Sequence, residues 1–361
     1  MELRYILNRV RQYGISKAGR KVYDRIMRYK GYPVSINLEI MTQCNLRCRH
    51  CRVTYYSDII KNVEKGFMDF DTFKEMADRL SPLIRHASTF QFSSIEPLLH
   101  KDIFGMMDIV SAYNRHITFP LLSNGMLLNA ANIKELMKRE VPSVAVSLDG
   151  YTKEMVESFK TGVNFDKVVD NIRLLKEMSK GRIFITTVYI VTSENVNNLI
   201  EYIKFCHKLG VNQIVINGFF SFFPELSHLY LYSKDGNESV YKIFQEAYEV
   251  AQGLGIEVLF PSLTAKPMGC NSASVMFISE KGDVSPCVHL AYDVPFELFG
   301  DAMVMGPLFY GNIMLKPPLS IWFSDEYKAF RSKLEAHILP SQCIYCADGY
   351  GVICSNRHLS P

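Results

Sequence analysis

The stretch that decides the fold is Met41-Thr-Gln-Cys44-Asn-Leu-Arg-Cys48-Arg-His-Cys51. Its spacing, C-x3-C-x2-C, brings three thiolates close enough to ligate three irons of one iron–sulfur cube. The next cysteine along the chain is Cys206, so no fourth thiolate lies nearby in the sequence. One iron of such a cube therefore stays open and can bind a small molecule. A structural zinc site is the alternative, although zinc usually takes four ligands from paired C-x2-C knuckles.

This motif resembles the signature of the radical S-adenosylmethionine (radical SAM) enzymes. In that family the open iron binds the amino and carboxylate groups of SAM, and an electron from the cluster cleaves SAM to a 5′-deoxyadenosyl radical. The resemblance implies that Cys44, Cys48 and Cys51 are the catalytic cluster ligands. It implies a [4Fe–4S] cluster with an open iron site and SAM as cofactors, and a flavodoxin- or ferredoxin-like electron donor.

Strand-like and helix-like patterns alternate through the first two thirds of the chain. Repeated strand–helix units produce parallel sheets, and the resemblance implies a partial (β/α)6 TIM-like barrel of the α/β class. In such barrels the loops after the strands build the site. Strands are expected at 34–40, 88–92, 117–122, 143–147, 182–191 and 213–217, and helices at 69–80, 103–113, 132–139, 165–178, 197–209 and 241–254.

Three segments of the chain are predicted. Residues 1–33 form a basic amphipathic N-terminal helical segment, residues 34–259 the barrel, and residues 260–361 a small cysteine-rich domain.

Short polar motifs follow the predicted strands and match turns of the radical SAM family. Glu96 stands where the family has the acid of Gly-Gly-Glu-Pro, which binds the SAM ammonium, although Ser94 and Ile95 replace the glycines. Lys160 lies where the family often has an arginine for the SAM carboxylate; a solvated surface lysine is the alternative. The cofactor-binding residues that the resemblance implies are Glu96, Ser123, Asn124, Ser147, Asp149 and Lys160.

The remaining cysteines lie near the C-terminus, apart from Cys206, which falls within a predicted helix and reads as a buried, inert thiol. Their spacing resembles the SPASM extension of radical SAM enzymes, or its shortened twitch form, and implies one auxiliary iron–sulfur cluster, expected to be [4Fe–4S]. A zinc ribbon would use the same residue types. The expected ligands are Cys270, Cys287, Cys343 and Cys346, with Cys354 as a spare or substitute ligand.

Composition and charge bound the location and the partners. The chain of 361 residues carries a net charge of +3, whereas residues 1–30 hold nine Lys/Arg against two acids, which is 9 − 2 = +7. This basic segment predicts a contact with a membrane surface or an acidic partner, unless it is simply a solvated helix. No apolar run reaches transmembrane length. We expect no secretory leader and no nucleic-acid partner. We expect a cytoplasmic protein, with association with the membrane as the alternative.

The substrate class stays open at this point. The resemblance implies hydrogen-atom abstraction from a peptide or protein, or from a small molecule that is oxidised or epimerised. Action on a lipid, or maturation of a metalloenzyme cofactor, is the alternative. The alternative outside the enzymes is a non-catalytic iron–sulfur electron carrier or a zinc-ribbon scaffold.

Overall fold

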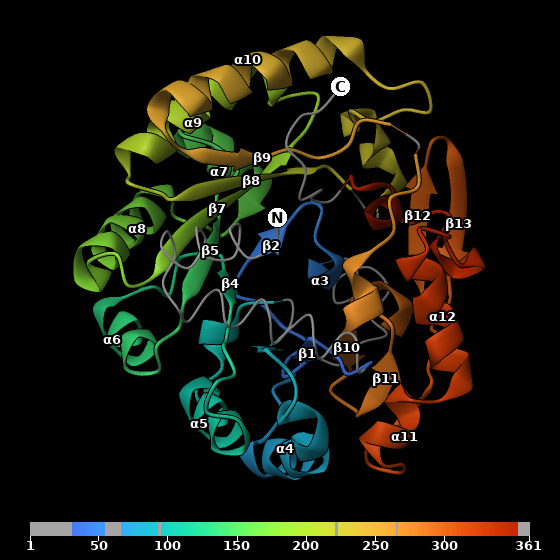
Figure 1. The fold of residues 1–361 in the computed structure, drawn as a ribbon. Coiled ribbons are helices and arrows are strands. Elements are labelled where there is room, and N and C mark those ends of the chain that lie inside the picture. The colour runs from blue at the N-terminus through green and yellow to red at the C-terminus, as the bar shows by residue number, and fades with distance from the viewer. Residues whose placement is uncertain (1–30, 55–65, 93–94, 221–222, 265, 353–361) are drawn as a thin grey trace, which may run out of the picture.

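The computed structural model describes residues 31–54, 66–92, 95–220, 223–264 and 266–352 of the chain (Figure 1). Residues 1–30 of the predicted basic N-terminal segment (residues 1–33) and the cysteine at position 354 lie outside these ranges.

Parallel strands form the centre of the molecule (Figure 1). Two sheets contain them, with the orders β14-β11-β10-β1-β3 and β4-β5-β7-β8-β9; in the first sheet β11 (Asp283–Ser285) and β14 (Gly311–Asn312) pair antiparallel, whereas β10 (Val275–Ile278) is parallel to β1. A parallel bridge between Thr89 and Thr118 joins the sheets, and the Phe90 amide donates to the Thr118 carbonyl at 2.9 Å. The parallel strands of the barrel are β1 (Ser35–Leu38), β3 (Thr89–Phe92), β4 (Leu121–Ser123), β5 (Ser143–Ser147), β7 (Phe184–Val191), β8 (Gln213–Gly218) and β9 (Glu257–Leu259).

Helices follow these strands and lie on the outside of the barrel (Figure 1). Helix α4 begins where the Asp69 carboxylate accepts from the amides of Asp71 and Thr72, at 3.0 and 2.9 Å. The order of strands and helices confirms the predicted (β/α)6 barrel. The helices are α4 (Phe70–Ile84), α5 (Ile103–Tyr113), α6 (Ala130–Lys138), α7 (Lys153–Phe159), α8 (Phe165–Ser179), α9 (Leu199–Lys208) and α10 (Glu238–Leu254).

The strand expected at 117–122 differs from the observed one. Strand β4 spans only Leu121–Ser123, and the preceding segment meets β3 at the single bridge made by Thr118. Pro120 lies between the two and has no amide hydrogen to donate to a strand ladder.

The C-terminal region continues the barrel sheet. Strand β10 (Val275–Ile278) pairs in parallel with β1, with Ser35 opposite Val275. The region then adds short strands and two helices: β11 (Asp283–Ser285), β12 (Val294–Leu298), β13 (Asp301–Met305), β14 (Gly311–Asn312), α11 (Pro318–Trp322) and α12 (Asp325–Glu335). Three further short elements lie near the cysteine loop: β2 (Arg47–Cys48), α3 (Arg52–Thr54) and β6 (Lys160–Thr161).

Side chains of the barrel strands alternate between a buried apolar layer and a more polar interior. Ile36 and Leu38 of β1 are fully buried and belong to the main core. The alternate positions carry polar side chains, including Asn37, Gln91 and Thr186, which line a cavity described below. The part of the chain that the structure describes contains no helix long and apolar enough to cross a membrane.

Candidate active site

The cysteine loop follows β1, and its three thiols lie within electrostatic reach of one another. The Leu46 amide donates to the Cys44 sulfur at 3.4 Å, and the Cys51 amide donates to the Cys48 carbonyl at 3.2 Å. Burial raises the pKa of Cys48 to about 12, and the charges of Cys51 and Cys44 add to this rise. Three thiols that repel one another as thiolates fit a metal cluster, because bound iron would stabilise the ionised form.

Two contacts fix the cysteine loop on the barrel. Strand β2 pairs antiparallel with β6, which places Cys48 opposite Lys160. The Asn124 side chain donates to the Asn45 side chain at 2.9 Å and so ties the loop to the end of β4. The cysteines, Lys160 and Asn124 therefore gather at one end of the barrel, as predicted from their places after the strands.

Glu96 and Ser123 form a buried hydrogen-bonded pair. The Ser123 hydroxyl donates to the Glu96 carboxylate at 3.0 Å, and the Asn124 amide donates to it at 2.7 Å. Burial raises the pKa of Glu96 to about 7, and these donors partly oppose that rise. The structure thus places three of the expected cofactor-binding residues in one network, in which Ser123 and Asn124 hold the carboxylate.

Lys160, Asp149 and Ser147 form a second buried network. The Lys160 ammonium lies 2.7 Å from Oδ2 of Asp149 and donates to the carbonyl and hydroxyl oxygens of Ser147, each at 2.7 Å. The other Asp149 oxygen accepts from the Ile190 amide at 2.7 Å. Lys160 is only 3% exposed, so the alternative of a solvated lysine is wrong. All three side chains are engaged with one another.

Besides Oδ2 of Asp149, which is ion-paired with Lys160, two buried polar atoms near this end of the barrel have no hydrogen-bond partner within the described residues. They are Nδ1 of His50, between Cys48 and Cys51, and the side-chain oxygen of Asn217, near the carboxyl end of β8. The His50 ring stacks on Phe159 with centroids 4.6 Å apart. Buried polar atoms are normally satisfied, so these two suit a polar ligand such as SAM. Asn217 belongs to none of the sequence motifs described above.

Four C-terminal cysteines come together in the second region. The pKa of Cys343 is raised to about 12, first by burial and then by the charge of Cys270. Burial also raises the pKa of Cys346, and the charges of Cys287, Cys270 and Cys343 raise it further. The four thiols therefore lie within electrostatic reach of one another, and an all-thiol donor set fits an iron–sulfur cluster. Within the described ranges, no three Cys, His, Asp or Glu side chains are placed so that they could hold a single metal ion.

Cys206 is fully buried in α9 and contacts the Thr187 hydroxyl at 3.5 Å. It lies in the main core, as predicted.

A cavity of about 1070 Å³ lies between the barrel and the C-terminal cysteines. Asn37, Gln91 and Thr186 line it from the barrel, and Cys270 and Cys287 line it from the C-terminal region. Ala145 also lines the cavity; it precedes Ser147 by two residues and so faces the same side of β5. The cavity therefore reaches from the polar side chains of the barrel interior, on the strand face that also carries Ser147, to the second cysteine site.

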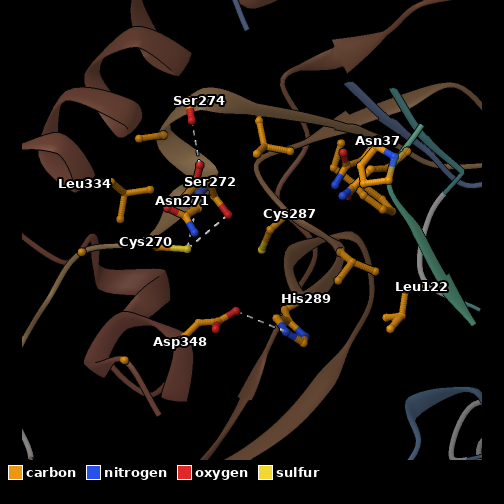
Figure 2. Close-up of a pocket in the computed structure, with 18 of the residues that line it drawn as sticks. Asn37, Leu122, Cys270, Asn271, Ser272, Ser274, Cys287, His289, Leu334 and Asp348 are labelled. Atoms are coloured by element: carbon orange, nitrogen blue, oxygen red, sulfur yellow. Dashed lines mark hydrogen bonds and ion pairs between the residues drawn. The ribbon is translucent and has the colours of Figure 1, made fainter. Parts of the chain in front are cut away.

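Sequence reasoning missed two polar residues of the cavity wall, Asp348 and His289. Figure 2 shows them pointing toward each other near Cys270 and Cys287, with Oδ2 of Asp348 4.0 Å from Nε2 of His289. Burial raises the pKa of Asp348 to about 6. Both residues follow a predicted ligand by two positions, Cys346 and Cys287, and that proximity is the signal that could have identified them.

A second missed contact connects the two regions. The Tyr292 hydroxyl donates to the carboxylate of Glu39, which is 1% exposed and directly follows β1.

Comparison with known proteins identifies both regions. The sequence profile of the radical SAM superfamily matches residues 38–206, and that of SPASM, an iron–sulfur cluster-binding domain, matches residues 270–347. A relative from Pyrococcus furiosus, the tungsten-containing aldehyde ferredoxin oxidoreductase cofactor-modifying protein, is 27% identical over 316 residues, 86% of each chain. An AdoMet-dependent heme synthase from Oleidesulfovibrio alaskensis is 23% identical over 341 residues, 85% of this chain and 78% of the relative.

Solved structures share the fold. The structure of anSMEcpe with bound AdoMet has a TM-score of 0.65 at 19% identity and covers 88% of this chain and 89% of the other. That of Streptococcus suis SuiB bound to the precursor peptide SuiA has a TM-score of 0.62 at 13% identity, over 91% and 74% of the two chains. The chain is therefore an enzyme of the radical SAM superfamily with a C-terminal SPASM domain, and its cofactors are a [4Fe–4S] cluster, SAM and auxiliary iron–sulfur clusters bound by the SPASM domain.

Proposed function

We propose that this enzyme modifies a substrate bound in the cavity between the barrel and the SPASM cysteines. When bound together, the cluster and SAM supply a 5′-deoxyadenosyl radical that abstracts a hydrogen atom. The observation that carries the proposal is the position of the cavity, which has Ala145 and Gln91 on the barrel side and Cys270 and Cys287 on the other. Its volume of about 1070 Å³ lies just above the usual range for ligand sites, about 300–1,000 Å³.

The proposal assigns a role to each part of the site. Cys44, Cys48 and Cys51 hold the first cluster, and Glu96 accepts the ammonium group of SAM by a charge-assisted hydrogen bond. Ser123 and Asn124 orient the Glu96 carboxylate, because both donate to it. Lys160 and Asp149 position Ser147 and the cysteine loop, because their own charges are already paired with each other.

The SPASM cysteines hold the auxiliary cluster in this proposal. Cys270, Cys287, Cys343 and Cys346 are the ligands, and Cys354 stays a spare or substitute ligand outside the described residues. We keep the boundary between the barrel and the C-terminal region at residues 259 and 260. This boundary assigns β10 to the C-terminal region, although β10 pairs with β1 of the barrel. A flavodoxin- or ferredoxin-like protein is the proposed electron donor.

Two substrate classes are supported to different degrees. A peptide or protein substrate is supported by the shared fold with SuiB and anSMEcpe, both of which have structures with bound peptide. Maturation of a metalloenzyme cofactor is the second candidate, because the Pyrococcus furiosus relative, described as a cofactor-modifying protein, is similar over 86% of both chains.

Anaerobic reconstitution tests the proposed function. The wild-type protein with dithionite and SAM should release 5′-deoxyadenosine, and Cys44→Ala should not. Cys206→Ala is the matched control, because this thiol lies in the core away from both sites and should leave the release intact. Release by Cys44→Ala equal to that of the wild type would reject the assignment of the first site.

A further inference from the structure

A buried carboxylate lies where β1 leads into the cysteine loop. Glu39 directly follows β1 and is 1% exposed. A carboxylate at such depth needs hydrogen-bond donors to replace the water that it has lost. The hydroxyl of Tyr292 donates to it, and the Glu39 amide donates to the Ile278 carbonyl at 2.9 Å. Because Ile278 ends β10, the SPASM region holds Glu39 by both its side chain and its backbone.

The chain between Glu39 and the cysteines is itself fixed. Ile40 is 1% exposed and Thr42 is 6% exposed. The Met68 amide donates to the Ile40 carbonyl at 2.9 Å, and the Thr42 amide donates to the Gly66 carbonyl at 3.1 Å. Tightly packed segments transmit a displacement instead of absorbing it. A change in the position of Glu39 would therefore reach the cysteine loop.

Tyr292 stands in a similar relation to the second cysteine site. It follows Cys287 by five residues, and one short helical turn, Val288–Ala291, lies between them. Glu39 precedes Cys44 by five residues. The side chains of Tyr292 and Cys287 pack against the same hydrophobic cluster, which is separate from the core around β1. The hydrogen bond thus connects the two cysteine sites through two short stretches of chain.

We infer that Tyr292 and Glu39 are positioning residues, whose hydrogen bond lets the SPASM region hold the cysteine loop in the geometry that binds SAM. This inference rests on the proposed function, since it takes this loop as the site of the first cluster. Neither residue is one of those assigned to SAM above, so their effect on SAM passes through the loop. A change in the SPASM region should therefore weaken SAM binding although the SAM pocket itself is unaltered.

Three substitutions test this contact. Tyr292→Phe removes the hydroxyl and keeps the ring. Glu39→Asp keeps the charge but shortens the side chain by a methylene, whereas Glu39→Gln keeps the length and an oxygen that can accept from Tyr292. Equilibrium dialysis would measure SAM binding to the anaerobically reconstituted full-length enzyme at pH 8, above the pKa of about 7 of Glu96.

The expected changes in SAM affinity follow from the loss or retention of the hydrogen bond. SAM should bind about fivefold more weakly to Tyr292→Phe and to Glu39→Asp, an effect typical of residues that act through others. Glu39→Gln should stay within about twofold of the wild type, because the acceptor is retained. The double variant Tyr292→Phe/Glu39→Asp should lose no more than about fivefold, since both changes remove the same contact.

Tyr113→Phe is the matched control. The Tyr113 hydroxyl donates to the Asp78 carboxylate at 3.2 Å on the outer helices α4 and α5, so the same atom is lost from a tyrosine–carboxylate pair outside both cysteine sites. SAM affinity should not change in this variant. Iron content is measured for every variant, and if Tyr292→Phe loses iron, the comparison of Glu39→Asp with Glu39→Gln tests the inference.

SAM affinities of Tyr292→Phe and Glu39→Asp equal to that of the wild type would overturn the inference. An equal loss in Tyr113→Phe would do so too, as would a loss in Glu39→Gln as large as that in Glu39→Asp. Release of 5′-deoxyadenosine by the wild type is measured on the same preparation. Its absence rejects the proposed function, whereas normal release with unchanged affinities of the variants rejects the positioning role alone.

Discussion

Removal of the Lys160 charge should destabilise the protein strongly. The Lys160 ammonium lies 2.7 Å from Asp149, and the two side chains are 3% and 0% exposed. In Lys160→Met the Asp149 carboxylate would remain buried without its counter-charge. Loss of one partner from a buried ion pair destabilises proteins by about 3–5 kcal/mol. For a chain of this size we expect Tm to fall by roughly 5–10 °C.

The double variant Lys160→Met/Asp149→Asn separates charge from packing. An asparagine keeps an oxygen that can accept from the Ile190 amide, which now donates to Asp149 at 2.7 Å. The double variant should therefore recover most of the loss and lie within about 2 kcal/mol of the wild type. Lys153→Met is the control, because Lys153 is exposed in the first turn of α7 and should change stability by less than about 0.5 kcal/mol.

Anaerobic urea unfolding followed by circular dichroism measures five proteins: the wild type, Lys160→Met, Asp149→Asn, the double variant and the Lys153→Met control. The first four form a double-mutant cycle that gives the coupling between the two charges. A change below about 1 kcal/mol in Lys160→Met would refute the reasoning, since a buried unpaired carboxylate cannot be so well tolerated. A double variant as unstable as the sum of the two single variants would refute it too.

Three further predictions concern the pocket, the C-terminal segment and the second cluster. Glu96 has a pKa of about 7 and must be ionised to bind an ammonium, so SAM affinity should rise between pH 6 and pH 7.5 by equilibrium dialysis. Glu96→Gln should bind weakly with no such rise; an unchanged pH profile would exclude Glu96 from the pocket. In Gly218→Ala the new Cβ would lie 2.6 Å from Cγ1 and 2.7 Å from the carbonyl oxygen of Val352, which predicts about 1–3 kcal/mol of destabilisation in urea. Gly253→Ala in α10 meets no atom within 4 Å and should instead stabilise by about 0.5–1 kcal/mol; equal effects of the two would contradict the close contact. Cys287→Ser should lower the iron content from about eight to about four per chain while 5′-deoxyadenosine release persists; unchanged iron would exclude Cys287 as a ligand.

The sequence was sufficient for the barrel and for the positions of its motifs. Strand periodicity placed Glu96, Ser123 and Ser147 after successive strands, and parallel strands bring such positions to one edge. Local pattern failed where long-range pairing decides the outcome. Strand β10 lies beside β1 although about 240 residues separate Ser35 from Val275, and nothing local to either strand specifies that register.

The sequence also did not predict which residue a charged side chain contacts. Lys160 was expected to contact SAM or solvent, yet the pairing of β6 with β2 buries it beside Asp149. Likewise, Tyr292 meets Glu39 only because the SPASM region continues the sheet that starts at β1. Such contacts depend on tertiary placement, whereas the cysteine spacing that identified both cluster sites is a local property of the chain.

Electron paramagnetic resonance of the dithionite-reduced Cys287→Ser variant, recorded with and without SAM, tests the central claim most directly. This variant should retain the cluster held by Cys44, Cys48 and Cys51 and lose the auxiliary one. SAM should shift the g-values of the remaining signal, because one iron without a protein ligand binds it. Identical spectra in the two samples would show that no iron is available to SAM, and the assignment of this chain's active site would be wrong.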